Sequence, residues 1–192
     1  KLKYNGELEI SILPCNQLGQ LPSGQALETL LTSNLTSHTK AIIMTHASNV
    51  CGTILPLKEV STFCQKHNLL FIIDTAQTAG TIIFNFEELK ADALAFTGHK
   101  GLLGPQGIGG VVLSPRLTSI LEPLVTGGTG SSSETELQSD HMPDRFEAGT
   151  PNIADTVAFK YAIDFIEGLG KKNIRQHEEE LLAYATGNLE IG

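Results

Sequence analysis

Short apolar runs alternate with helical patterns along this chain, and this alternation constrains its fold more than any other feature. It is typical of strand-helix-strand units that stack around a mostly parallel sheet. The expected strands are residues 8–13, 41–44, 69–73, 93–96 and 108–113. The pattern therefore predicts an α/β fold, with a mostly parallel sheet and helices on both faces.

Helical periodicity fills the intervals between the first three expected strands. Pro56 suits the first turn of a helix that ends near Asn68. The residues on its apolar face are Leu57, Val60, Phe63 and Cys64. An earlier helix is expected after Ser23, which suits its cap. The apolar residues of this earlier helix are Leu27, Leu30 and Leu31.

The chain changes character after the last expected strand. Residues 127–144 are polar and rich in Gly and Ser, which predicts a long exposed loop. An amphipathic helix is expected beyond Pro151, ending around residues 168–170, and another over residues 174–185. The apolar residues assigned to the first of these are Val157, Tyr161, Ile163 and Phe165. Two helices without strands predict that a second domain begins here.

Composition excludes several classes of partner. With 13 Lys and Arg against 21 Asp and Glu, the net charge of −8 argues against a surface that neutralises nucleic-acid phosphates. The longest apolar run, residues 69–73, is far shorter than the roughly 20 residues that cross a bilayer. Three cysteines without a C-x-x-C pair favour reduced thiols. We therefore expect a soluble, cytoplasmic protein that binds neither nucleic acid nor membrane.

Polar residues follow three of the expected strands directly. These segments are residues 45–49, 74–77 and 97–101. Ligands of open parallel sheets bind outside the carboxyl ends of the strands, so the three segments are expected to converge on one ligand.

Lys100 is the most informative single residue of these segments. Its neighbours include glycines at positions 98, 101 and 104, where larger side chains are expected to obstruct a ligand. A Lys amine forms Schiff bases with aldehydes, because it loses its proton when desolvated. Asp74 provides the second group that this chemistry needs, because a carboxylate keeps a heterocyclic nitrogen protonated and makes the ring an electron sink. This chemistry is that of pyridoxal phosphate.

Each of these residues also has an ordinary structural interpretation. An Asp after a strand commonly forms a turn or caps a helix, and a Lys beside Gly is commonly a solvated loop residue. His46 and His99 also fit structural roles. The glycines over residues 104–110 match neither a dinucleotide loop nor a P-loop. The coincidence of all three polar segments at successive strand ends favours the cofactor interpretation.

Four segments of the sequence resemble the cysteine desulfurase group of the class V aminotransferase-like enzymes. They are residues 45–53, 74–77, 97–109 and 145–152. The resemblance implies the fold-type-I architecture, in which a large domain binds pyridoxal phosphate, a smaller domain closes over it, and two subunits share the active sites. Residues 1–150 would then be the C-terminal part of the large domain, and 151–192 a linking helix with the start of the small domain. The expected strand 108–113 would be antiparallel to the others.

The resemblance also implies a role for each site residue. Lys100 would be the Schiff-base lysine, Asp74 the partner of the ring nitrogen, and Gln77 a contact of the phenolic oxygen, with Asn49 near the same oxygen and the substrate. Thr97 and His99 would bind the phosphate, and Thr150 the phosphate of the neighbouring subunit. The implied reaction converts L-cysteine to L-alanine and passes sulfur on as a persulfide, in a homodimer, with a sulfur-acceptor protein as a further partner. Transamination, selenocysteine lysis, epimerisation and a non-catalytic interaction module stay open.

Several of the family's other features are not found in this sequence. They are a phosphate-binding loop, a ring-stacking residue, the persulfide-forming cysteine and the arginine that binds the substrate carboxylate. Cys51 is not where the family places its nucleophile, and Cys64 falls on a helix face typical of core packing. We therefore expect the chain to be the middle portion of a longer enzyme and to bind the cofactor weakly, if at all, on its own.

Overall fold

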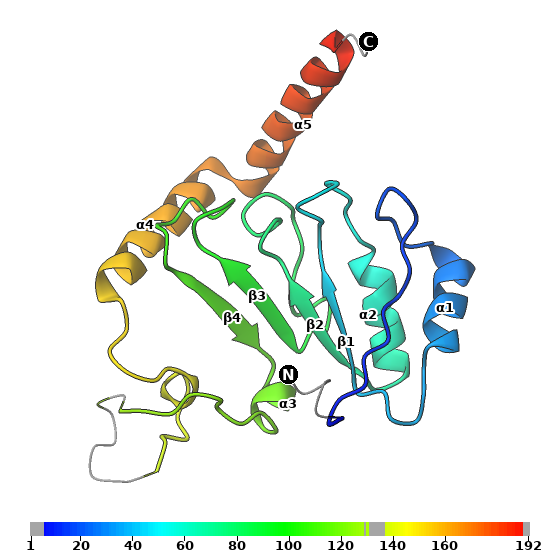
Figure 1. Cartoon of the computed structure of the whole chain (residues 1–192). Coiled ribbons are helices and arrows are strands. Elements are labelled where there is room, and N and C mark those ends of the chain that lie inside the picture. The colour runs from blue at the N-terminus through cyan, green and yellow to red at the C-terminus, as the bar shows by residue number, and fades with distance from the viewer. Residues whose placement is uncertain (1–5, 129, 131–136, 190–192) are drawn as a thin grey trace. The chain divides into compact units, whose positions relative to one another are not determined.

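The computed structural model describes residues 6–128, 130 and 137–189. In chain order the elements are α1 (Gly24–Ser33), β1 (Ala41–Thr45), α2 (Leu57–Lys66), β2 (Leu70–Asp74), β3 (Ala93–Thr97), β4 (Gly109–Leu113), α3 (Pro115–Thr118), the 3-10 helix η1 (Asp144–Phe146), α4 (Ile153–Leu169) and α5 (Lys171–Asn188) (Figure 1). The chain forms two compact units. The first comprises Lys1–Thr78 and Phe84–Phe96, and the second Ala79–Ile83 and Thr97–Gly192. The expected domain boundary at residue 150 stays a prediction.

A parallel sheet forms the centre of the first unit, as the alternating pattern predicts. β1 pairs with β2 from Ala41 and Leu70 to Thr45 and Asp74, and β2 pairs in parallel with β3 (Figure 1). Three expected strands are thereby confirmed to within one residue at each end. The carboxyl ends of β1 and β2 lie side by side, which places the loops that follow them at one edge of the sheet.

Helices α1 and α2 bury one face of this sheet. The core consists of Leu27, Leu31, Leu57, Val60, Phe63, Cys64, Leu69, Phe71, Ile73, Leu89 and Ala91. Phe71 and Ile73 on β2 are completely buried, and each such side chain stabilises the fold by about 1.5–3 kcal/mol. The apolar face predicted for α2 is confirmed by these contacts, and Cys64 is a core residue as expected.

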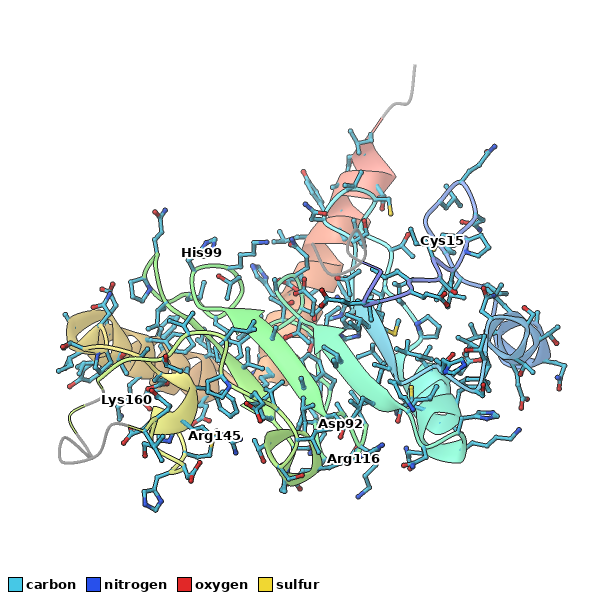
Figure 2. The ribbon with its side chains drawn as sticks, turned by 60° about the horizontal axis from the view of Figure 1, so that its bottom comes forward. Cys15, Asp92, His99, Arg116, Arg145 and Lys160 are labelled. Atoms are coloured by element: carbon cyan, nitrogen blue, oxygen red, sulfur yellow. The ribbon has the colours of Figure 1, made fainter. Side chains whose placement is uncertain are left out.

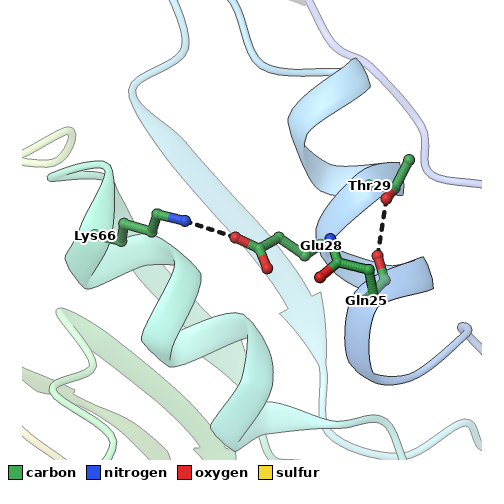
Figure 3. Close-up of polar contacts among 4 residues, drawn as sticks. All are labelled: Gln25, Glu28, Thr29 and Lys66. Atoms are coloured by element: carbon green, nitrogen blue, oxygen red, sulfur yellow. Dashed lines mark hydrogen bonds and ion pairs between the residues drawn. The ribbon is translucent and has the colours of Figure 1, made fainter.

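Polar contacts join α1 to α2 at their exposed sides. Ser23 caps α1 by position but not by a side-chain bond, and the Gly24 N–H instead donates to Glu59 Oε2 at 2.6 Å. Lys66 Nζ donates to Glu28 Oε1 at 2.6 Å, and this bond holds the pKa of Glu28 below its usual value (Figure 3). These contacts connect residues about 35 positions apart in sequence.

Two predictions about this unit are wrong in detail. Residues 8–13 form no strand, and Ile10 and Ile12 are 52% and 81% exposed. Alternating polarity produces a strand only where a neighbouring strand offers its hydrogen bonds, and the described residues offer none to this segment. Pro56 is the residue before α2 rather than part of its first turn, so the helix begins at Leu57.

The second unit contains β4, α3 and the two long helices. The expected strand 108–113 is found as β4, and its direction relative to the other strands stays a prediction. Helix α4 has the bounds that the sequence predicts, whereas α5 extends beyond the expected residues 174–185 at both ends. Asn152 caps α4, its Oδ1 accepting from the Asp155 N–H at 3.2 Å. The predicted loop 127–144 falls partly outside the described residues, and its described part contains no helix or strand before η1.

The apolar face predicted for α4 is not the buried one. Of the four residues assigned to it, Val157, Tyr161 and Phe165 are each at least half exposed and Ile163 is half-buried, whereas Ile166 is 2% exposed. Periodicity identifies apolar positions, but which of them are buried depends on the surfaces that reach the helix. None of the described helices combines the length and the apolar character needed to cross a membrane.

Candidate functional site

Three predicted site residues of the first unit lie at the carboxyl ends of neighbouring strands. Asn49 is in the loop after β1, Asp74 is the last residue of β2, and Gln77 is in the turn that follows. Because β1 and β2 are parallel and Thr45 pairs with Asp74, both loops start from the same edge of the sheet. The structure therefore brings together two of the three strand ends that the sequence assigned to one ligand.

One carboxylate oxygen of Asp74 accepts a structural hydrogen bond, and the other can accept a hydrogen bond from a ligand. Its Oδ1 accepts from the Ala76 N–H at 2.8 Å, which is the ordinary turn role of an Asp after a strand. By strand alternation its side chain points away from the face occupied by Phe71 and Ile73, and it is exposed. Its Oδ2 has no partner among the described residues, so it can accept a hydrogen bond from a ligand.

Two buried threonines hold the segment Asp74–Thr78, which we call the threonine turn. Both the N–H and the Oγ1 of Thr75 donate to Ala95 O, at 2.8 and 2.9 Å. The Thr78 N–H donates to Thr75 O at 2.9 Å. Both side chains are completely buried, whereas Asp74 is exposed and Gln77 half-buried. The buried residues Thr75 and Thr78 thus fix the backbone that carries the candidate ligand contacts Asp74 and Gln77.

His46 is a buried residue that contacts this turn, and its sequence position predicts only a structural role. Its Nδ1 lies 2.9 Å from Thr78 Oγ1, and its ring meets Phe84 edge-on at 5.2 Å between centroids. Burial lowers the pKa of His46, because it disfavours the charged imidazolium. Thr75 lies within the predicted segment 74–77 without a role of its own, and Thr78 lies one residue beyond it. Their only signal was their position next to two predicted site residues.

The second unit contains the residues Thr97–Gly104, which we call the lysine loop. Thr97 ends β3 and is half-buried, while Lys100 and the labelled His99 (Figure 2) are exposed. The Gly98 N–H donates to Ile108 O at 2.9 Å, and the Gly104 N–H donates back to Gly98 O at 2.8 Å. These bonds close the loop at its base and leave the amine of Lys100 accessible to an aldehyde.

The glycines of the lysine loop are needed for packing rather than for ligand space, which corrects the sequence interpretation. A Cβ at Gly98 would lie 2.4 Å from Ile108 Cγ2, and one at Gly104 would lie 2.5 Å from a ring carbon of Phe159. A Cβ at Gly101 would lie 2.6 Å from Ala79 O. Atoms of the protein therefore fill the space beside these glycines that was expected to hold a ligand.

Thr150 is exposed in the segment before α4. Upstream of it, Arg145 donates to Thr118 O and Leu121 O at 3.2 and 2.9 Å, and the Gly149 N–H donates to Gly128 O. These bonds tie the backbone before Thr150 to the region of α3. The expected contact of Thr150 with a neighbouring subunit's phosphate stays a prediction.

The cysteines differ in environment. Cys51 is exposed, and hydrogen bonds with Ser48 and Thr53 lower the pKa of its thiol to about 7. Burial, with a smaller effect of Asp92, raises the pKa of Cys64 to about 12. Cys15, Cys51 and Cys64 are all free.

The donor set fits pyridoxal phosphate. Asp74 offers an exposed carboxylate for a ring nitrogen, the amides of Asn49 and Gln77 offer donors for an oxygen, and Lys100 offers an exposed amine. Asp74 belongs to the first unit and Lys100 to the second, so their meeting across one ring stays a prediction. Within residues 6–128, 130 and 137–189, no three His, Cys, Asp or Glu side chains gather as a metal site requires.

Comparison with known proteins identifies the family. The profile described as Aminotransferase class-V matches residues 1–191. A cysteine desulfurase of Escherichia coli is 36% identical over 186 residues, which are 95% of this chain and 44% of that protein. The apo structure of a cysteine desulfurase from Thermococcus onnurineus NA1 superposes with a TM-score of 0.71 at 34% identity, covering 77% of this chain and 38% of that one.

A variant of C-DES with glycine covalently linked to its PLP cofactor superposes with a TM-score of 0.69 at 26% identity, covering 77% of this chain and 40% of that one. The chain thus spans about two fifths of the length of the proteins it matches. The partial fold-type-I architecture expected from the sequence agrees with these structural neighbours. With a family profile that matches nearly its whole length, this chain belongs to the class V aminotransferase family.

Proposed function

We propose that this chain is the cofactor-binding portion of a pyridoxal-phosphate-dependent cysteine desulfurase, which converts L-cysteine to L-alanine and transfers the sulfur as a persulfide. Family membership and the cysteine desulfurases among its relatives support this function. The observation that supports it most is the exposed carboxylate of Asp74 at a parallel strand end, fixed by the buried threonine turn.

Pyridoxal phosphate, when bound, supplies an electron sink for a negative charge that develops on the substrate's α-carbon. Lys100 Nζ would hold the aldehyde carbon and, once released, move a proton at the substrate's α-carbon. Asp74 Oδ2 would accept a hydrogen bond from the ring nitrogen and keep that nitrogen protonated. In this proposal, Lys100 would attach the cofactor covalently, and Lys100 and Asp74 together would determine where protons are held or moved.

The remaining contacts would orient the cofactor. Gln77 and Asn49 would donate to the phenolic oxygen, Thr97 and His99 would bind the phosphate, and Thr150 would bind the phosphate of a second subunit. On this basis the enzyme is a cytoplasmic homodimer that passes sulfur to an acceptor protein. The three free thiols are consistent with a reducing compartment.

Reductive labelling tests the proposal. The full-length protein that contains this chain is incubated with excess pyridoxal phosphate and reduced with borohydride, and the modified peptides are mapped by mass spectrometry. We expect modification to concentrate at Lys100 rather than at the α5 lysines, Lys171 and Lys172. We also expect Asp74→Asn to reduce Lys100 labelling while leaving Lys171 unchanged.

Lys90→Arg is the matched control, because it removes an exposed lysine outside the lysine loop. It should label at Lys100 as the wild type does, whereas Lys100→Arg should lose the selective signal. Uniform modification of all lysines in the wild type would contradict the proposed cofactor role and favour a non-catalytic interaction module.

A further inference from the structure

His46 links the two strand-end loops of the first unit. Its backbone N–H donates to Asp74 O at 2.8 Å, and its own carbonyl accepts from the Leu55 N–H at 2.8 Å. Its side chain, 5% exposed, reaches Thr78 Oγ1 through Nδ1. One residue therefore contacts both ends of the threonine turn, Asp74 by its backbone and Thr78 by its imidazole.

The imidazole is oriented by its surroundings as well as by this bond. Phe84 meets the ring edge-on at an interplanar angle of 87°, and Phe84 itself packs against the hydrophobic core. A ring held on one side by an aromatic neighbour and on another by a hydroxyl has little rotational freedom. The core thus fixes His46, and His46 fixes the far end of the threonine turn.

Beyond Asp74 the turn belongs to no helix or strand, so its shape depends on the backbone bonds of Thr75 and Thr78 together with side-chain bonds. Thr75 is bonded to Ala95 O and Thr78 to His46 Nδ1. Between and beside these buried residues, Asp74 is exposed and Gln77 is half-buried. If the bond between Thr78 Oγ1 and His46 is lost, the Thr78 N–H still donates to Thr75 O, but the turn loses its side-chain connection to His46, while Asp74 keeps its ladder position in β2.

We propose that His46 is a positioning residue: through Thr78 it holds the threonine turn in the conformation in which Asp74 and Gln77 face the cofactor. The proposal rests on the proposed function, and it assigns roles to two buried residues that do not touch the ligand. It predicts that the Thr78 hydroxyl matters for cofactor capture even though it is completely buried.

Isosteric variants at position 78 provide the test. Thr78→Val removes the hydroxyl and keeps the shape, whereas Thr78→Ser keeps the hydroxyl. A net hydrogen bond of about 1 kcal/mol corresponds to about a fivefold change. In the full chain we expect Thr78→Val to speed amide hydrogen exchange at residues 76–78 about fivefold, and to reduce borohydride labelling of Lys100 at subsaturating pyridoxal phosphate by a similar factor. Thr78→Ser should match the wild type in both measurements.

Two further variants separate positioning from general stability. Val60→Ala removes core volume on α2, outside both loops, and should lower the midpoint of thermal unfolding without changing Lys100 labelling. His46→Asn places a polar atom where Nδ1 stood and should retain more labelling than His46→Leu. These controls exclude the explanation that any destabilised chain captures less cofactor.

The outcomes distinguish this proposal from the one on which it rests. Selective Lys100 labelling in the wild type that is unchanged in Thr78→Val would overturn the positioning role and leave the proposed function standing. Uniform lysine labelling in the wild type would overturn the proposed function and the cofactor role of His46 together. Faster exchange and reduced labelling in Thr78→Val, with neither in Thr78→Ser, would support both.

Discussion

At the scale of single residues, Cys51 and Cys64 provide a direct check on the environments in the first unit. The thiolate is the reactive form of cysteine, and the pKa of about 7 for Cys51 means that about half of its thiols are ionised at neutral pH. We expect iodoacetamide to modify Cys51 at a rate that rises with pH and has a midpoint near 7. Buried Cys64 should stay unmodified until the chain unfolds.

Peptide mapping after labelling at several pH values measures these rates separately. Ser48→Ala should move the midpoint for Cys51 upward, because it removes the largest cause of the lowered pKa. A midpoint near 8.5, the ordinary value of a cysteine, would contradict the hydrogen-bonded geometry.

His46 gives a second residue-scale prediction, because burial lowers its pKa in the folded state. Below the unfolded value of about 6.5, the unfolded chain binds a proton that folded His46 does not, so the free energy of unfolding should fall as pH decreases. The loss cannot exceed about 1.4 kcal/mol per pH unit for one group. Urea unfolding between pH 7.5 and about 5 should show a shallower loss in His46→Asn than in the wild type. Equal slopes would mean that His46 titrates normally in the folded chain.

At the scale of elements, the lysine loop and α4 fit together through glycines. Gly104→Ala places a Cβ against the Phe159 ring and should destabilise the chain by about 1–3 kcal/mol. Phe159→Ala removes that ring, so the double variant should lose less stability than the sum of the two single variants.

Gly168→Ala on α4 is the control. Its Cβ would meet no atom within 4 Å, so it should instead stabilise the chain by about 0.5–1 kcal/mol. Urea unfolding of the four variants measures these differences, and strict additivity of the first pair would contradict the contact.

At the scale of the whole molecule, the chain matches only about two fifths of its relatives' length. The resemblance found in the sequence implies that the family's cofactor site also uses a phosphate-binding loop and a ring-stacking residue, which are not found in this chain. We therefore expect the 192 residues on their own to bind pyridoxal phosphate weakly, without saturation at stoichiometric cofactor. An absorbance titration measures this, and a tight, stoichiometric band near 1:1 would contradict it.

The sequence alone determined the fold class, the parallel strands β1 to β3 and the candidate site segments, because local periodicity and strand-end polarity are properties of neighbouring residues. The tertiary structure decided what depends on residues distant in sequence. Residues 8–13 lack a neighbouring strand, the exposed face of α4 is the one expected to be buried, and Gly98 and Gly104 accommodate Ile108 and Phe159. The contact of His46 with Thr78 spans 32 positions, and no local pattern specifies which buried hydroxyl an imidazole meets.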